Sequence, residues 1–271
     1  MIDLSRWGLG VATVVAACTI TSAARAADTP PVADSAEGEK EAKDVRAQVP
    51  ILAYAYTAYG TQAGTMGAAA YGLGLAGNTR PTLGGGGMVW GSPIDRLTLI
   101  GDGSRDIFGN FAPSAAVVVR LLGTPGNGWS LGALGKFKVD GFALGPNKEM
   151  ESEIETGFLV SYAKYGWYFD LNGIGGMGTG DDGEVDAEGR IRFGRDIGRL
   201  VRIGIDGQAR FRLAGSTRLP GGRTWDYAGG PQLMIGTKGF FGAITAGPAT
   251  MGIIDRSIGW TAMVSVGGMT L

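Results

Sequence analysis

The chain has 271 residues, of which 50 are glycine, 44% are hydrophobic and 18% are charged, and its formal net charge is −1 at pH 7. Glycine costs a helix interior about 1 kcal/mol relative to alanine, so this composition disfavours a helical protein and favours many strands and turns. The near-neutral charge offers no basic face to a phosphate backbone, and we expect no nucleic-acid partner.

The sequence contains no histidine and a single cysteine. These counts exclude serine–histidine nucleophile pairs, imidazole metal ligands and intramolecular disulfides. We therefore expect no enzyme, with no catalytic residues, no metal and no cofactor.

The first 26 residues have the layout of a secretory signal peptide. Arg6 precedes an apolar stretch at 7–20, and a small-x-small sequence ends at Ala26. Cleavage after Ala26 predicts export from the cytoplasm. A lipoprotein signal is the alternative, because the sequence VAAC, which ends at Cys18, resembles a lipobox. Residues 27–50 are polar and acidic. This composition predicts a flexible periplasmic lead, a segment that precedes the first strand without folding into it.

From residue 51 to the end, short runs with a hydrophobic period of two alternate with glycine-rich turns, which is the pattern of β-strands. We predict twelve strands, at 66–77, 82–91, 95–101, 113–123, 129–140, 150–164, 167–178, 184–195, 199–213, 226–236, 240–250 and 258–271. The stretch ILAYAYTAYG at 51–60 is an alternative additional strand.

Five successive predicted strands, between residues 129 and 213, have one apolar and one charged face. In the last of them Val201, Ile203 and Ile205 alternate with Arg202 and Asp206. Glycine and alanine dilute the apolar faces, which would pack poorly against a second sheet but are tolerated by lipid. An arginine or lysine at the bilayer midplane costs about 2–4 kcal/mol, so in a membrane the charged faces point inward. The predicted lumen-lining residues are Lys136, Lys138, Glu151, Glu153, Asp170, Glu184, Asp186, Glu188, Arg190, Arg192, Arg202, Asp206, Arg210 and Arg212.

Two hairpins are predicted to place opposite charges face to face. Across the turn RDIGR the expected opposite residues are Glu184 and Arg212, Asp186 and Arg210, Glu188 and Gln208, and Arg190 and Asp206. Across GFALGPNKE they are Lys138 and Glu151, and Lys136 and Glu153. Such ladders would satisfy one another in an interior where water is scarce.

Aromatic residues gather near both sets of strand ends, where tight turns alternate with longer loops. Near the tight turns lie Trp129, Tyr165, Trp167, Phe193, Phe240 and Phe241, and near the longer loops lie Phe142, Trp225, Tyr227 and Trp260. Over about residues 66–271 the chain resembles the Gram-negative outer-membrane β-barrel class. The terminal signal of that class commonly ends in phenylalanine, whereas this chain ends in Leu271.

This resemblance implies an all-β, antiparallel up-and-down transmembrane β-barrel of about twelve strands at residues 51–271, in contact with outer-membrane lipid and inserted by outer-membrane assembly machinery. The predicted function is a porin-like narrow channel, with a small solute as candidate cargo, or a structural barrel. A secreted or lipid-anchored soluble β-sandwich that acts as a binding module is the alternative.

Two motifs point elsewhere. GLGLAG at 72–77 matches a dinucleotide-binding string but lacks a strand-turn-helix context. The acidic stretch GDDGEVDAEG has calcium binding as an alternative to solvated loop acids, although the spacing of a calcium-binding hand is missing.

Overall fold

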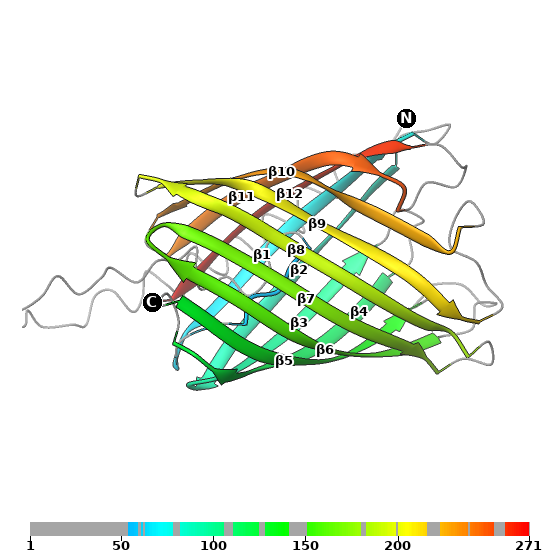
Figure 1. The fold of residues 1–271 in the computed structure, drawn as a ribbon, viewed down its shortest axis with the longest axis horizontal. Coiled ribbons are helices and arrows are strands. Elements are labelled where there is room, and N and C mark those ends of the chain that lie inside the picture. Colours follow the sequence, from blue (N-terminus) through cyan, green and yellow to red (C-terminus); the bar gives the residue numbers. More distant parts are fainter. Residues whose placement is uncertain are drawn as a thin grey trace, which may run out of the picture.

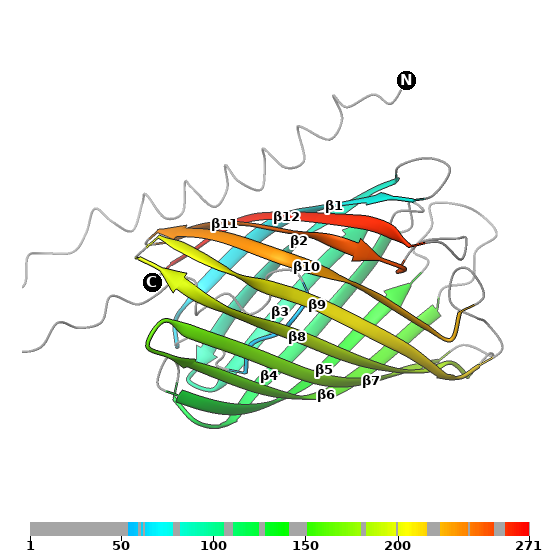
Figure 2. The ribbon, with the colours of Figure 1, turned by 45° about the horizontal axis from the view of Figure 1, so that its top comes forward.

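The structure, a computed structural model, forms a barrel whose strands are inclined to its long axis (Figures 1 and 2). It describes residues 54–58, 61, 63–77, 82–105, 111–124, 128–140, 151–179, 183–198, 200–215, 223–237, 239–251 and 258–270, without the side chains of Asp140 and Glu151. The predicted signal peptide (1–26) and lead (27–50) lie outside the described residues. In the described part of the chain, no helix is long and apolar enough to cross a membrane.

Twelve antiparallel strands form the barrel wall. They are β1 (Met66–Ala76), β2 (Thr82–Ile94), β3 (Leu97–Arg105), β4 (Phe111–Leu122), β5 (Gly128–Asp140), β6 (Glu151–Lys164), β7 (Trp167–Gly178), β8 (Val185–Ile197), β9 (Val201–Ala214), β10 (Trp225–Thr237), β11 (Phe240–Ala249) and β12 (Gly259–Thr270). All twelve predicted strands are confirmed. Residues 54–58, offered as an alternative additional strand, are not part of the wall.

The sheet closes on itself. Each strand pairs with its neighbours in the chain, and β1 pairs with β12 along its whole length, from Met66 opposite Thr270 to Ala76 opposite Trp260. Closure removes the free strand edges that an open sheet would expose. The described strands form one closed sheet, so the alternative of a two-sheet sandwich is not favoured.

Side chains alternate between the interior and the outer surface, as the period of two requires. In β9, Arg202 and Asp206 are 4% and 2% exposed, whereas Ile203 and Ile205 are 44% and 49% exposed. The exposed face is apolar and the buried face is charged, which is the arrangement of a wall that faces lipid.

Tight turns at one rim fix the strand pairing. Between β6 and β7, Tyr165 and Gly166 have φ values of 55° and 75°, and Lys164 pairs with Trp167. Two successive residues with positive φ make the type I′ turn whose twist matches a hairpin.

The predicted register of two hairpins is wrong by two residues. Across β8 and β9 the structure places Asp186 opposite Arg212, Glu188 opposite Arg210, Arg190 opposite Gln208 and Arg192 opposite Asp206. Pairing there begins at Ile197 and Val201, because Gly198, with φ of 65°, opens the turn one residue later than predicted. A shift of two keeps every side chain on its predicted face.

The second wrong register is that of β5 and β6. Lys138 lies opposite Glu153 and Lys136 opposite Glu155, and the ladder continues to Asp140 and Glu151. Glu155 is only 5% exposed, and its Oε1 lies 2.9 Å from Lys136 Nζ. A carboxylate this buried requires a cationic partner, which the observed register provides.

Aromatic side chains face outward near both rims. Trp167 stacks on Phe193 with ring centroids 5.5 Å apart near the tight turns, and Trp225 stacks on Tyr227 at 5.8 Å near the longer loops. Phe241 corrects the prediction, because it is 0% exposed and lies inside the barrel, 6.4 Å from Trp90. Phe142 lies outside the described residues.

A closed barrel is expected to resist unfolding by detergent until it is heated. Protein extracted from membranes should therefore migrate differently on SDS gels before and after boiling. A truncated variant without residues 259–271 cannot pair β1 with β12 and is the control. Identical migration of the full chain with and without boiling would contradict closure.

Candidate functional site

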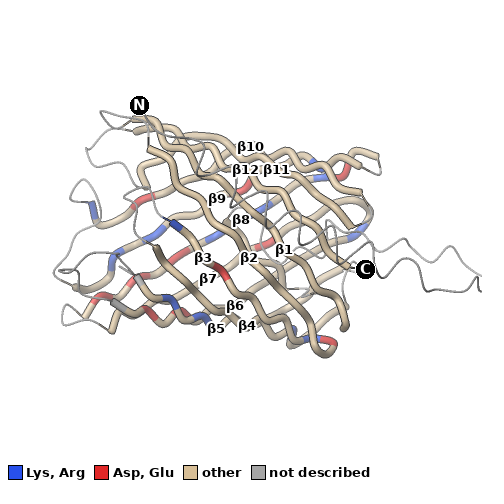
Figure 3. Tube along the Cα trace, turned by 180° about the vertical axis from the view of Figure 1, so that it is seen from behind, with Lys and Arg blue, Asp and Glu red and all other residues tan. Residues whose placement is uncertain are grey.

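The barrel interior has one charged and one uncharged side. Strands β1, β2, β11 and β12 are neighbours in the wall and carry no charged residue, whereas charges gather on β5 to β9 (Figure 3). We call the inward side chains of β5 to β9 the charged wall. Twelve of the fourteen predicted lumen-lining residues lie on these strands with described side chains; Glu184 precedes β8, and the side chain of Glu151 is not described.

The uncharged side is filled by apolar side chains that point inward. Met88 and Trp90 from β2, Phe241 from β11 and Met269 from β12 belong to one buried cluster. This interior core could not be predicted from the sequence, because these strands are apolar or small on both faces and give no two-faced signal. Apolar side chains as well as charged ones therefore narrow the lumen.

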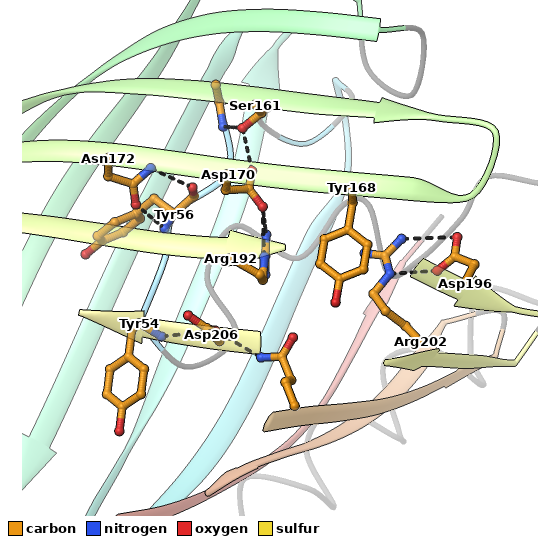
Figure 4. Close-up of polar contacts among 12 residues, drawn as sticks. Tyr54, Tyr56, Ser161, Tyr168, Asp170, Asn172, Arg192, Asp196, Arg202 and Asp206 are labelled. Carbon is orange, nitrogen blue, oxygen red and sulfur yellow. Dashed lines mark hydrogen bonds and ion pairs between the residues drawn. The ribbon is translucent and has the colours of Figure 1, made fainter. Parts of the chain in front are cut away.

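A segment that precedes β1 lies inside the barrel. Residues 54–58, which we call the lumen segment, are all buried, and Ala55 and Ala58 are 0% exposed. Tyr56 and Ala58 pack in the interior apolar cluster, and the Arg190 guanidinium lies 5.2 Å from the Tyr56 ring centroid. Figure 4 shows the segment beside inward side chains of the charged wall.

Hydrogen bonds from the charged wall hold the backbone of the lumen segment. The amides of Tyr54, Tyr56 and Ala58 donate to Asp206 Oδ2 (3.4 Å), Asn172 Oδ1 (2.7 Å) and Ser161 Oγ (2.7 Å), respectively. Asn172 Nδ2 donates back to the Tyr56 carbonyl at 3.0 Å, and Arg190 Nη1 donates to the Tyr54 carbonyl at 3.2 Å. Every second residue is held in this way, so the segment is extended.

The lumen segment runs along the barrel rather than across one rim. Next to β1, the Thr61 amide donates to Thr98 Oγ1 beside the β2–β3 turn. At the other end, Tyr54 clusters with Leu75 and Ala249, which lie near the longer loops. The segment therefore lies between the two rims, inside the space that a solute would have to cross.

One buried ion pair is linked to the lumen segment. Arg192 Nη2 lies 2.7 Å from Asp170 Oδ2, and the two side chains are 3% and 2% exposed. The other carboxylate oxygen of Asp170 accepts the Ser161 hydroxyl, which in turn accepts the Ala58 amide (Figure 4). The pair thus supports the segment as well as the wall.

Almost every predicted lumen residue takes part in an ion pair. The pairs are Lys136–Glu155, Lys138–Glu153, Arg190–Glu188, Arg192–Asp170, Arg202–Asp196, Arg210–Asp226, Arg212–Glu184 and Arg212–Asp186. Asp206 instead accepts from Gln232 Nε2 at 2.9 Å. The side chain of Glu151 lies outside the described residues.

Several residues of this site lie outside the predicted lumen-lining set. Asp196, Asp226, Ser161 and Asn172 face the interior. Asp196, Ser161 and Asn172 lie on the same parity as predicted lumen residues of their strands, and Asp226 pairs with Arg210. Their alternation with apolar residues was the available signal for them. The contacts of the lumen segment left no such signal.

Tyr168 fills a gap that two glycines leave in the charged wall. A Cβ on Gly194 or Gly204 would lie 2.3 Å from the Tyr168 hydroxyl oxygen. The ring lies 4.1 Å from the Arg202 guanidinium carbon, a distance at which cation–π attraction operates (Figure 4). The glycines thus make room for an aromatic ring among charges.

The motifs that pointed elsewhere have other roles. The first five residues of the GLGLAG string lie at the end of β1, Gly77 follows the strand, and no helix follows it in the described residues. Glu184 and Asp186 of the acidic stretch both contact Arg212, while Asp181 and Asp182 lie outside the described residues. Within the described part of the chain, no group of three or more acidic side chains could hold a metal ion.

No protein-family model and no curated protein matches the chain. Among solved structures, the COG4313 outer membrane channel from Pseudomonas putida F1 superposes with a TM-score of 0.53 and 12% identity, over 82% of this chain and 100% of that one. The fold is that of an outer-membrane β-barrel. CdiB from Acinetobacter baumannii gives a TM-score of 0.35 and 9% identity, over 76% of this chain and 60% of that one, too little to support an argument.

The likeness concerns the fold alone and supports a place in the outer membrane. In barrels of this class the short turns face the periplasm. The rim with the Tyr165–Gly166 turn is then periplasmic, and the lumen segment rises from that rim toward the outer loops.

Proposed function

We propose that this outer-membrane barrel is a channel for small ions or polar solutes that its own lumen segment holds closed. The proposal rests on the hydrogen bonds that the backbone amides of Tyr54, Tyr56 and Ala58 donate to the charged wall. These bonds hold the lumen segment inside the barrel, where it blocks the passage of a solute. Water can replace such bonds when the segment leaves.

Unpartnered polar atoms inside the barrel support a hydrophilic path. Asp206 Oδ1, Gln232 Oε1 and Arg192 Nη1 are buried and have no hydrogen-bond partner among the described residues. Buried polar atoms of this kind bind water or a polar solute. The solved channel with a similar fold is consistent with the proposal.

The proposal includes the route to the membrane. A signal peptide at residues 1–26 exports the chain, assembly machinery inserts the barrel, and no catalytic step is assigned to it. The test is conductance of the full-length protein in planar lipid bilayers. Conductance that rises when the lumen segment is released supports a channel, whereas a barrel that stays silent after release is structural.

The variant Arg210→Glu is expected to shift ion preference toward cations. Arg210 has the most exposed side chain among the ion-paired arginines of the charged wall, at 27%, and its Nη2 lies 3.2 Å from Asp226 Oδ2. The change places two carboxylates side by side, and the charge that lines a pore sets its selectivity. The measurement is the reversal potential in a KCl gradient.

The exchanged pair Arg210→Glu with Asp226→Arg is the matched control. It restores one charge of each sign, so its reversal potential should return toward that of the parent protein. An unchanged reversal potential in the single variant would remove Arg210 from the conduction path.

A further inference from the structure

An apolar groove crosses the lipid-facing surface near the periplasmic rim. Its volume is about 850 Å³, within the range of roughly 300–1,000 Å³ that is common for ligand sites. It is lined by residues of β7 to β11, and the outward side chains among them include Phe193, Ile203, Ile205, Leu233 and Ile244. Pro231 and Ala246 are short side chains in this lining and leave the surface hollow.

Two cations lie at the end of the groove, on either side of Trp167. Lys164 pairs with Trp167 across β6 and β7, and Trp167 pairs with Arg195 across β7 and β8, so the three residues form one outward row. The Arg195 guanidinium lies 5.1 Å from the Trp167 ring centroid. In the described part of the chain neither cation has a carboxylate partner, and the outward positions of β6 to β11 carry no carboxylate.

The depth of this row matches that of lipid headgroups. Trp167 belongs to the aromatic residues near the tight turns, and aromatic rings sit at the boundary between headgroups and acyl chains. An arginine at this depth can bind a phosphate through two parallel hydrogen bonds, and lysine adds a second positive charge. The groove continues from the row into the apolar zone.

We propose that the groove binds one anionic phospholipid of the periplasmic leaflet. Its phosphate contacts Arg195 and Lys164, and one acyl chain lies along Phe193, Ile203 and Leu233. The two cations are complementary to the phosphate of such a lipid, and the apolar groove beside them is complementary to its acyl chain. The site is on the outer surface, so it exists whether or not the barrel conducts.

Native mass spectrometry of the full-length protein in a nonionic detergent tests this site. The probes are palmitoyl-oleoyl phosphatidylglycerol and the corresponding phosphatidylcholine. The parent protein should retain one phosphatidylglycerol in preference to phosphatidylcholine. The double variant Lys164→Ala with Arg195→Ala should weaken phosphatidylglycerol binding by about tenfold or more, because charge-assisted hydrogen bonds are lost.

Two further variants separate charge from shape. Ala246→Phe fills the groove without changing charge and should reduce binding of both lipids. Arg105→Ala removes an outward arginine at the opposite rim and should leave binding unchanged. Equal binding of the two lipids by the parent protein, or an undiminished affinity in the double variant, would overturn the proposal. A dimer that Ala246→Phe dissociates would assign the groove to a second copy of this chain and would also overturn it.

Discussion

Deletion of residues 27–58 is expected to raise the single-channel conductance several-fold. The deletion keeps the predicted signal sequence and removes the lumen segment, whose backbone is bound inside the barrel by Asp206, Asn172 and Ser161. A barrel of this size has limited interior space, so one extended segment accounts for a large part of it. The measurement is the current through single barrels in planar bilayers.

A reversible lock tests the same prediction without a deletion. Cysteines introduced by Ala58→Cys and Ser161→Cys would join the segment to β6, where the Ala58 amide and Ser161 Oγ are 2.7 Å apart. The only native cysteine, Cys18, lies in the predicted signal peptide, so the new disulfide has no competitor in the mature chain. The oxidised form should carry less current than the reduced form.

Each single-cysteine variant is the control for the lock, since it cannot form the bond. Equal currents in the oxidised and reduced double variant would show that the segment does not need to move. Equal currents in the deleted and full-length chains would show that the segment does not limit conduction.

The variant Asp170→Ala is expected to lower the free energy of unfolding by about 3–5 kcal/mol. It leaves Arg192, which is 3% exposed, buried without its carboxylate. Removal of one partner of a buried ion pair costs this much because the remaining charge is neither solvated nor paired. The measurement is the urea midpoint of barrels folded in detergent micelles.

Two controls test whether the loss of stability comes from leaving a buried charge unpaired. Lys138→Ala breaks a pair whose side chains are 26% and 23% exposed, and an exposed pair is worth about 0–1 kcal/mol. The double variant Asp170→Leu with Arg192→Met removes both charges and should recover much of the stability. Similar losses in Asp170→Ala and Lys138→Ala would contradict the argument from burial.

The same variant should also loosen the lumen segment. Asp170 accepts the Ser161 hydroxyl, and Ser161 accepts the Ala58 amide. Stability of the wall and closure of the lumen are therefore coupled through one carboxylate.

The strands and their faces could be predicted from the sequence because both depend on local pattern. A period of two and glycine-rich turns suffice to place β9 and to separate Ile203 from Arg202. The pairing register was missed because a slip of two residues leaves that pattern unchanged. Only the backbone conformation of the turn, set at Gly198, decides between the two registers.

The lumen segment could not be recognised because its sequence has the period of a wall strand. Tyr54 and Tyr56 alternate with small residues, as strand residues do, but their amides bond to side chains of β7 and β9. Contacts between residues more than 100 positions apart leave no local trace in the sequence. The role of the charged wall in selectivity stays a prediction that the Arg210→Glu variant tests.

The seam between β1 and β12 has a consequence for the order of folding. The Met66 amide donates to Thr270 Oγ1, 204 positions away, so this pairing must await synthesis of nearly the whole chain. Such distant contacts form late. The lumen segment is tied to β1 by a short link, and the interior near the seam is filled by Trp90, Phe241 and Met269. We expect the lumen segment to enter while the sheet is still open. The segment would then be in place before β1 pairs with β12 and closes the barrel.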